Sequence, residues 1–215
     1  MNDHKSRFFK LALRKGNLRF GSFTLKSGRV SPYFFNAGGF DDGASLEELA
    51  ACYAAAIVQS GLEFDMLFGP AYKGIPLAAA TAIALHHHHG RNVPYSFNRK
   101  EAKDHGEGGI IVGAALAGRV LVIDDVISAG TSMRESIGII DAAEARTAGI
   151  AIALDRQERG SGARSAAQEV TDEYGIPCVS IASLDDLIAY LESSGAGDID
   201  LNAIQAYRER YGTED

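Results

Sequence analysis

The chain has 215 residues, of which 46% are hydrophobic and 23% charged, the balance of a soluble globular protein with a sizeable core. A formal net charge of −7 at pH 7 argues against broad binding to nucleic acid or anionic lipid, which requires a basic face. Residues 1–17 lack the apolar stretch of a signal peptide, no segment resembles a membrane helix, and Cys52 and Cys178 lie far apart. We therefore expect a cytoplasmic protein with two reduced, buried thiols.

Hydrophobic periodicity and the positions of Gly and Pro predict alternating helices and strands. The chain is expected to open with a helix and two extended segments, at residues 3–15, 18–25 and 30–36. The next helix should begin at Ser45, which has Glu48 three residues later as in a capping box, and stop at Gly61. Further strands are predicted at 64–68, 94–98, 119–124, 149–155 and 177–181. Further helices are predicted at 76–88, 131–145 and 164–174, with two more near the C-terminus.

Strands that alternate with helices of ten or more residues indicate right-handed crossover units. We therefore predict an α/β fold in which a doubly wound, mostly parallel sheet is flanked by helices. No internal repeat or linker divides the chain, so residues 1–215 are expected to form a single domain. Residues 1–40 are expected to contribute to a small N-terminal appendage, here called the hood.

Four consecutive histidines, His86 to His89, suggest a metal site at first sight. Neighbours on a helix point about 100° apart, so only His86 and His89 could share a face. A solvated helix end is the preferred interpretation.

The segment Val120–Ser132, VLVIDDVISAGTS, carries the most chemical information. Its apolar half leads to the carboxyl end of a strand, where ligands bind in open α/β sheets. Asp124 and Asp125 stand at that edge, and a loop of small residues then runs into a helix. Such a loop presents backbone N–H groups to a phosphate, while the carboxylates suit sugar hydroxyls or a metal-bound sugar. The pattern predicts a ribose 5-phosphate site, against the plainer alternative of an ordinary strand, turn and capped helix.

This segment closely resembles the signature of the type I phosphoribosyltransferases. Three further segments, Phe23–Asn36, Phe68–Ala78 and Phe97–Gly109, resemble those of bacterial orotate phosphoribosyltransferases in the same order, over nearly the whole chain. The resemblance implies transfer of the 5-phosphoribosyl group from 5-phosphoribosyl 1-pyrophosphate to orotate, giving orotidine 5'-monophosphate and pyrophosphate in UMP biosynthesis. It also implies Mg²⁺, held mainly by substrate and water with no assigned protein ligand, and a homodimer.

Lys73 lies beside Gly69, Ala71 and Gly74, whose small size could let backbone approach a ligand. A surface lysine on a tight turn is the alternative. The resemblance implies that Tyr72 and Lys73 bind pyrophosphate, with a cis peptide just before the tyrosine.

Residues 99–109 are charged and rich in glycine at their end, which by itself favours a solvated connection. The resemblance instead implies a catalytic lid that reaches the neighbouring subunit's site. Arg99 and Lys100 would contact pyrophosphate, and Lys103 and His105 would be catalytic.

The donor site implied by the resemblance comprises Lys26, Tyr72, Lys73, Arg99, Lys100, Lys103, His105, Asp124, Asp125, Val126, Ile127, Ser128, Ala129, Gly130, Thr131 and Ser132. Of these, Asp124 and Asp125 are also assigned as catalytic. One departure is Ser128, where the family commonly has threonine; the hydroxyl is retained.

The orotate site implied by the resemblance comprises Phe34, Phe35, Ser128 and Arg156. Adjacent strand residues point to opposite faces, so one phenylalanine is expected to pack inward, and two core aromatics are the alternative. Arg156, just past a strand end, could bind the orotate carboxylate bidentately, or form a surface ion pair with Asp155 or Glu158.

Three rival functions remain at this stage. A transferase for adenine or a 6-oxopurine would not need Arg156 as a carboxylate partner. A regulator that binds nucleic acid conflicts with the acidic balance and the basic lid. A synthetase of the phosphoribosyl donor would need a nucleotide site that the sequence does not display.

Overall fold

The computed structural model describes residues 3–25, 27–103, 109–127, 130–160, 162–195 and 199–213, without the side chains of residues 102 and 103. Within these residues a six-stranded sheet has the order β5-β4-β3-β6-β7-β8. Its strands are β3 (Met66–Gly69), β4 (Tyr95–Lys103), β5 (Gly109–Gly113), β6 (Arg119–Ile123), β7 (Arg146–Asp155) and β8 (Cys178–Ser183). All neighbours pair in parallel except β4 and β5, which are antiparallel, so the prediction of a mostly parallel sheet is confirmed.

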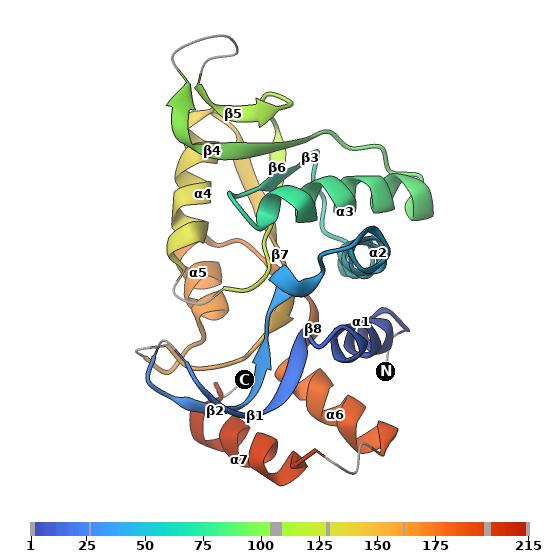
Figure 1. Cartoon of the computed structure of the whole chain (residues 1–215). Helices are drawn as coiled ribbons and strands as arrows, with labels where there is room; N and C mark the ends of the chain where they lie inside the picture. The colour runs from blue at the N-terminus through green and yellow to red at the C-terminus, as the bar shows by residue number, and fades with distance from the viewer. Residues whose placement is uncertain are drawn as a thin grey trace.

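Helices cover both faces of this sheet (Figure 1). One face carries α2 (Gly43–Ser60) and α3 (Gly74–His89), and the other carries α4 (Thr131–Ala142) and α5 (Ala166–Tyr174). A separate apolar cluster fills each side, and the strand β6 contributes to both because its residues from Val120 to Ile123 are all buried. This is the reason for the uninterrupted apolar run before Asp124.

The hood is built on an antiparallel hairpin of β1 (Leu18–Thr24) and β2 (Val30–Phe35). Three helices pack around it or beside it: α1 (Asp3–Arg14), α6 (Leu184–Ser194) and α7 (Leu201–Tyr211). Figure 1 shows the hairpin and α7 below the end of the sheet that carries β7 and β8. The C-terminal helices thus belong with the hood in space, although they are far from it in sequence.

Two predictions of local structure were wrong. Helix α2 begins at Gly43, and its capping side chain is Asp42, which accepts a hydrogen bond from the Ser45 N–H. Asp42, three residues before Ser45, is therefore the N-cap residue of α2, and the predicted capping box of Ser45 and Glu48 does not form. The expected loop at 99–109 is partly strand, because β4 continues to Lys103 and pairs with β5, which the sequence did not reveal. In the described part of the chain, no helix is long and apolar enough to cross a membrane.

Candidate active site

Asp124 and Asp125 directly follow β6 at the carboxyl edge of the sheet, and each residue is only 8% exposed. Backbone contacts hold this pair to its neighbours. The hydroxyl of Tyr53, on α2, donates to the Asp124 carbonyl at 2.7 Å. The Ala153 N–H of β7 donates to the Asp125 carbonyl at 2.9 Å. The two carboxylates are therefore fixed before any ligand arrives.

The Asp124 carboxylate accepts hydrogen bonds through both oxygens. Oδ1 accepts from the Asp125 N–H at 2.9 Å, and Oδ2 accepts from the Ser132 hydroxyl at 3.3 Å. Burial, with a smaller contribution from the negative charge of Asp125, raises the pKa of Asp124 to about 6. A perturbed carboxyl in a pocket is typical of functional sites.

Lys73 lies at the start of α3, and its Nζ is 2.6 Å from Asp125 Oδ2. The lysine side chain is 54% exposed while that of Asp125 is 11% exposed. The ammonium can therefore leave the carboxylate for a ligand phosphate without being drawn out of the core. This contact brings the predicted pyrophosphate residue and the predicted sugar residue together.

The turn between β3 and α3 contains a cis peptide between Ala71 and Tyr72, as the resemblance implied. Asn98 of β4 supports this turn, because its Oδ1 accepts a hydrogen bond from the Ala71 N–H at 2.8 Å. A Cβ on Gly74 would lie 2.5 Å from Pro70 Cδ and 2.8 Å from the Ile123 carbonyl. A Cβ on Gly69 would similarly meet the Gly74 carbonyl. Both glycines are therefore required by protein packing, a reason that the sequence did not show, and close approach of a ligand to this backbone stays a prediction.

The start of α4 differs from that of the other helices. Side chains cap α2, α5, α6 and α7, namely those of Asp42, Ser165, Ser183 and Asp200. In α3 the first N–H groups donate to carbonyls of the preceding turn. Helix α4 begins after Gly130, whose φ is 70°, and among the described residues no side chain caps it. The N–H groups of its first turn are thus available to an anion.

A pocket of about 250 Å³ lies at this helix start. Its described lining is Asp124, Val126, Ile127, Gly130, Thr131, Ser132 and Met133. Six of these seven residues belong to the segment Val120–Ser132 that the sequence analysis singled out, and Met133 directly follows it. Ser128 and Ala129, also predicted here, lie outside the described residues, as do Lys26 and His105.

The remaining predicted pyrophosphate contacts lie on the neighbouring segments. Tyr72 is 68% exposed, and Lys100 Nζ lies 5.4 Å from the centre of its ring. Arg99 is half-buried on β4, and Lys103 ends that strand, although its side chain is not described. The strand thus places Arg99 and Lys100 next to the turn that carries Lys73.

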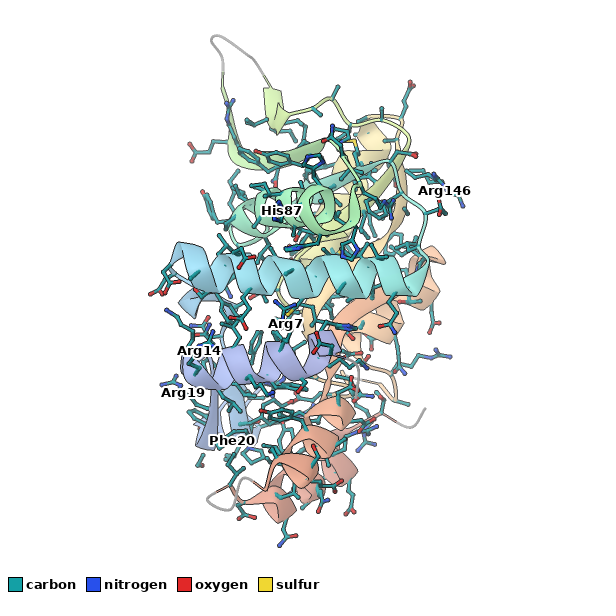
Figure 2. The ribbon with its side chains drawn as sticks, turned by 90° about the vertical axis from the view of Figure 1, so that its right-hand side faces the viewer. Arg7, Arg14, Arg19, Phe20, His87 and Arg146 are labelled. Atoms are coloured by element: carbon teal, nitrogen blue, oxygen red, sulfur yellow. The ribbon has the colours of Figure 1, made fainter. Side chains whose placement is uncertain are left out.

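On the base side, Phe34 and Phe35 point to opposite faces of the hairpin. Phe35 is 9% exposed and packs against Phe8 in the core. The Phe34 ring lies 5.5 Å from that of Phe23, and the Arg19 guanidinium is 5.6 Å from it. Figure 2 shows Arg19 on the hairpin, away from the labelled Arg146.

Arg156 follows β7 and forms the ion pair that was considered as its alternative. Its Nη2 is 2.5 Å from Glu158 Oε1, but the pair is not on the surface, since the side chains are 19% and 14% exposed. The guanidinium also lies over the Tyr33 ring, 4.4 Å from its centre. The largely buried guanidinium of Arg156 could therefore bind a ligand carboxylate beside the hood.

The sequence analysis missed several supporting residues: Tyr53, Asn98, Tyr33, Glu158 and Tyr207. Tyr53 and Tyr33 carried no signal, because a tyrosine within an apolar pattern resembles any core residue. Glu158 was noticed only as a possible ion-pair partner.

The model of the phosphoribosyl transferase domain family matches residues 40–177. A relative named orotate phosphoribosyltransferase, from Thioalkalivibrio sulfidiphilus, is 62% identical over 99% of this chain and 100% of its own length. The relative of that name from Pseudomonas aeruginosa strain PAO1 is 58% identical with the same coverage of both chains.

A crystal structure of orotate phosphoribosyltransferase from Francisella tularensis is 40% identical and superimposes with a TM-score of 0.86. The match covers 96% of this chain and 99% of that chain. The site geometry, the full-length sequence similarity and the fold agree. The chain therefore belongs to the orotate phosphoribosyltransferases of the phosphoribosyl transferase family.

Proposed function

We infer that the chain transfers the 5-phosphoribosyl group of 5-phosphoribosyl 1-pyrophosphate to a ring nitrogen of orotate, giving orotidine 5'-monophosphate and pyrophosphate. The observation that most supports this function is the buried pair Asp124 and Asp125, which lies shortly before the start of α4. Among the described residues no side chain caps that helix. A phosphate fits the helix start, and sugar hydroxyls fit the carboxylates. A ribose 5-phosphate presents both groups on one molecule.

The reaction breaks the bond between ribose C1 and the pyrophosphate oxygen, forms a bond from C1 to the ring nitrogen of orotate, and releases the proton of that nitrogen to water or to the leaving pyrophosphate. Positive charge develops on the ribose while negative charge collects on the leaving group. Asp124 and Asp125 orient the ribose by accepting its hydroxyl hydrogens. Lys73, Arg99 and Lys100, with Lys103 and His105 from the lid, stabilise pyrophosphate, and His105 donates a hydrogen bond or proton to it.

Mg²⁺ fits this site as a partner of substrate oxygens. Carboxylate oxygens are its preferred protein ligands, and Asp124 and Asp125 offer them. No group of three or more metal-ligating side chains occurs among the described residues, so the substrate and water would supply most of the coordination. When bound, the ion neutralises charge on the pyrophosphate.

The base side completes the proposal. Orotate carries a carboxylate, for which Arg156 is the proposed partner, while Phe34 and Ser128 are proposed to contact the base and Phe35, which packs in the core, to support Phe34 from the other face of the hairpin. We propose that residues 1–215 act as one domain, with residues 1–40 contributing the hood over the base, in the cytoplasm. Phosphoribosyl transfer to a purine would leave Arg156 without a purpose.

We also propose a homodimer in which the lid at 99–109 is shared across subunits. Helix α3 supports this, because it is apolar nearly all round and leaves Ile83 69% exposed, while Tyr72, which precedes the helix, is 68% exposed. A second copy of the chain is the partner expected to cover that face.

Lys103→Ala tests the lid. The variant should lower turnover by about 100-fold, while the affinity for the phosphoribosyl donor changes little, because a lid residue acts mainly in the closed state. Rapid-mixing turnover and donor titration measure the two quantities, with exposed Lys10→Ala as the control. Equal turnover in Lys103→Ala and wild type would exclude this role.

The function itself is tested by following orotate absorbance after mixing the purified protein with orotate, the donor and Mg²⁺. Controls omit Mg²⁺ or the donor, or replace orotate by adenine or hypoxanthine. Consumption of orotate that requires both the donor and Mg²⁺ is the expected result. Turnover of a purine alone would retain the sugar-phosphate site and overturn the base assignment, and no turnover of any base would favour a regulatory protein.

A further inference from the structure

Arg156 and Glu158 form an unusually asymmetric contact. Arg156 donates from Nε at 2.9 Å and from Nη2 at 2.5 Å, and both bonds go to the same oxygen, Glu158 Oε1. Nη2 also lies 3.4 Å from the Ser31 hydroxyl oxygen. Within the described part of the chain, Nη1 has no hydrogen-bond acceptor. One edge of the guanidinium is therefore occupied, and the two N–H groups of Nη1 remain.

The guanidinium of Arg156 lies over the ring of Tyr33. Tyr33 is completely buried, with its ring centre 4.4 Å from Arg156 Cζ. A second ring, that of Tyr207 on α7, meets Tyr33 edge to face at 6.2 Å. Burial, and then the charge of Glu158, raise the pKa of the Tyr207 phenol. Tyr33 thus covers the guanidinium of Arg156, and Glu158 holds the edge formed by Nε and Nη2.

The segment that carries both residues is itself tightly bound. Gln157 has a φ of 50°, and its N–H donates to Asp155 Oδ1 at 2.9 Å. Its carbonyl accepts the N–H of Thr213 at 2.9 Å, and the Arg159 N–H donates to the Tyr211 carbonyl at 2.8 Å. The turn at residues 155–159 is thus bound to the C-terminal end of α7 and the residues directly after it. Arg156 and Glu158 are presented from a backbone whose position is determined by several independent contacts.

Glu158 could affect orotate binding in two opposite ways. As a competitor, it would hold the positive charge that the orotate carboxylate needs, and removing it would strengthen binding. As a positioning residue, it would hold Arg156 in the binding orientation, and removing it would weaken binding. The geometry favours positioning, because Glu158 occupies Nε and Nη2 and leaves the N–H groups of Nη1 for a second carboxylate. Separating two side chains that are 19% and 14% exposed would also leave two poorly solvated charges.

We propose that Glu158 is a positioning residue that holds Nε and Nη2 of Arg156 so that Nη1 faces the carboxylate of orotate, with the guanidinium lying over the ring of Tyr33. The inference rests on the proposed function. In this proposal Arg156 and Glu158 together determine the preference for a ligand that carries a carboxylate over a neutral one.

Glu158→Gln tests the proposal in steady-state assays that vary orotate and the donor separately. The amide keeps the shape but loses the charge that organises the guanidinium, so KM for orotate should rise about tenfold while KM for the donor stays within about twofold. Glu158→Asp, which keeps the charge at shorter reach, should show a smaller rise. Glu209→Gln, an exposed glutamate on α7, is the matched control and should match wild type.

A neutral analogue gives a readout that a loss of folding would not produce. The carboxamide of orotate lacks the charge that Arg156 recognises, so wild type should bind it more weakly than orotate as a competitive inhibitor. In Glu158→Gln the preference for the carboxylate over the carboxamide should fall by about the same factor as the KM rises.

An unchanged or lowered KM for orotate in folded Glu158→Gln, or in Glu158→Asp, would overturn the positioning proposal; a lowered KM would instead identify a competitor. These outcomes presuppose an active wild type. A wild-type protein that consumes no orotate would overturn the proposed function and this inference together.

Discussion

The phosphate side and the base side of the site are built in different ways. On the proposed phosphate side, the described pocket lining comes from one segment, Asp124 to Met133, and an anion would meet a helix start. On the proposed base side, Arg156 contacts Ser31, Tyr33 and Glu158, and Tyr33 in turn contacts Tyr207, so residues of β2, α7 and the turn after β7 take part. A site formed by the backbone of one segment is determined by neighbouring residues in the sequence. A site formed by an oriented side chain such as that of Arg156 depends on tertiary contacts.

The two sides also differ in charge. Among the described residues the ion pair of Lys73 is with Asp125, whereas the Asp124 carboxylate accepts hydrogen bonds from the Asp125 N–H and the Ser132 hydroxyl. Arg156 already has its counter-ion in Glu158. If the two sides act independently, a substitution on the phosphate side should weaken recognition of the phosphoribosyl donor alone. A substitution on the base side should weaken recognition of orotate alone.

The largest expected effect comes from Asp124→Asn. The loss of charge-assisted hydrogen bonds to the ribose should lower kcat/KM for the donor by about 100-fold. KM for orotate should change less than about threefold. Steady-state kinetics with each substrate varied in turn measures both, and exposed Asp141→Asn on α4 is the control. A comparable loss for both substrates would show that the two sides act as one unit.

Arg156→Gln should give the converse result with a smaller effect. Removing the partner of the orotate carboxylate should raise KM for orotate by about 30-fold, the value of roughly 2 kcal/mol for such a bond. KM for the donor should remain within about twofold. Arg146→Gln is the control, because Arg146 is exposed and lies away from the hood in Figure 2. A rise in KM for the donor would contradict the separation.

The pH profile should locate the titration of the phosphate side. Because burial raises the pKa of Asp124 to about 6, its carboxylate should be lost as pH falls through that value. We expect kcat/KM for the donor to decline below about pH 6 by up to tenfold per pH unit.

The same shift has a consequence for stability. The native state takes up the Asp124 proton at a higher pH than the ordinary value of 3.8 for the unfolded chain, so this group lowers stability as pH rises from about 4 to about 6. In Asp124→Asn that part of the pH dependence of the unfolding free energy should disappear. A variant with an unchanged profile would show that Asp124 titrates near its ordinary value.

The smallest expected effect is on stability and comes from Gly74→Ala. The added Cβ would meet Pro70 and the Ile123 carbonyl, so we expect a loss of about 2 kcal/mol in unfolding free energy. Gly138→Ala, in the exposed middle of α4 with no atom within 4 Å of its Cβ, should instead stabilise by about 0.5–1 kcal/mol. Denaturant titration measures both changes. A normal stability with weaker donor binding in Gly74→Ala would restore the sequence-based reason for this glycine.

The alternation of apolar runs predicted the parallel sheet, and most of the segment singled out from Val120 to Ser132 lies at one pocket or in the strand before it, because these features depend on neighbours in sequence. The same reasoning placed the start of α2 two residues late, since two capping patterns overlap there and only packing selects one. It missed β5 because glycines and charges concealed a hairpin that forms by pairing with β4. The partnership of Arg156 with Tyr33 and Tyr207 could not be read from sequence, because nothing local links residues so far apart.

The absence of a capping side chain at the described start of α4 has a consequence for folding. The other helices for which a cap was found carry it in their own sequence, whereas α4 can take its cap from solution. A bound phosphate group would then act as a piece of secondary structure and reduce fraying of the first helical turn. Amide hydrogens of residues 131–133 should exchange rapidly in the free protein and slow when inorganic phosphate is added, so that the substrate organises part of the fold that recognises it.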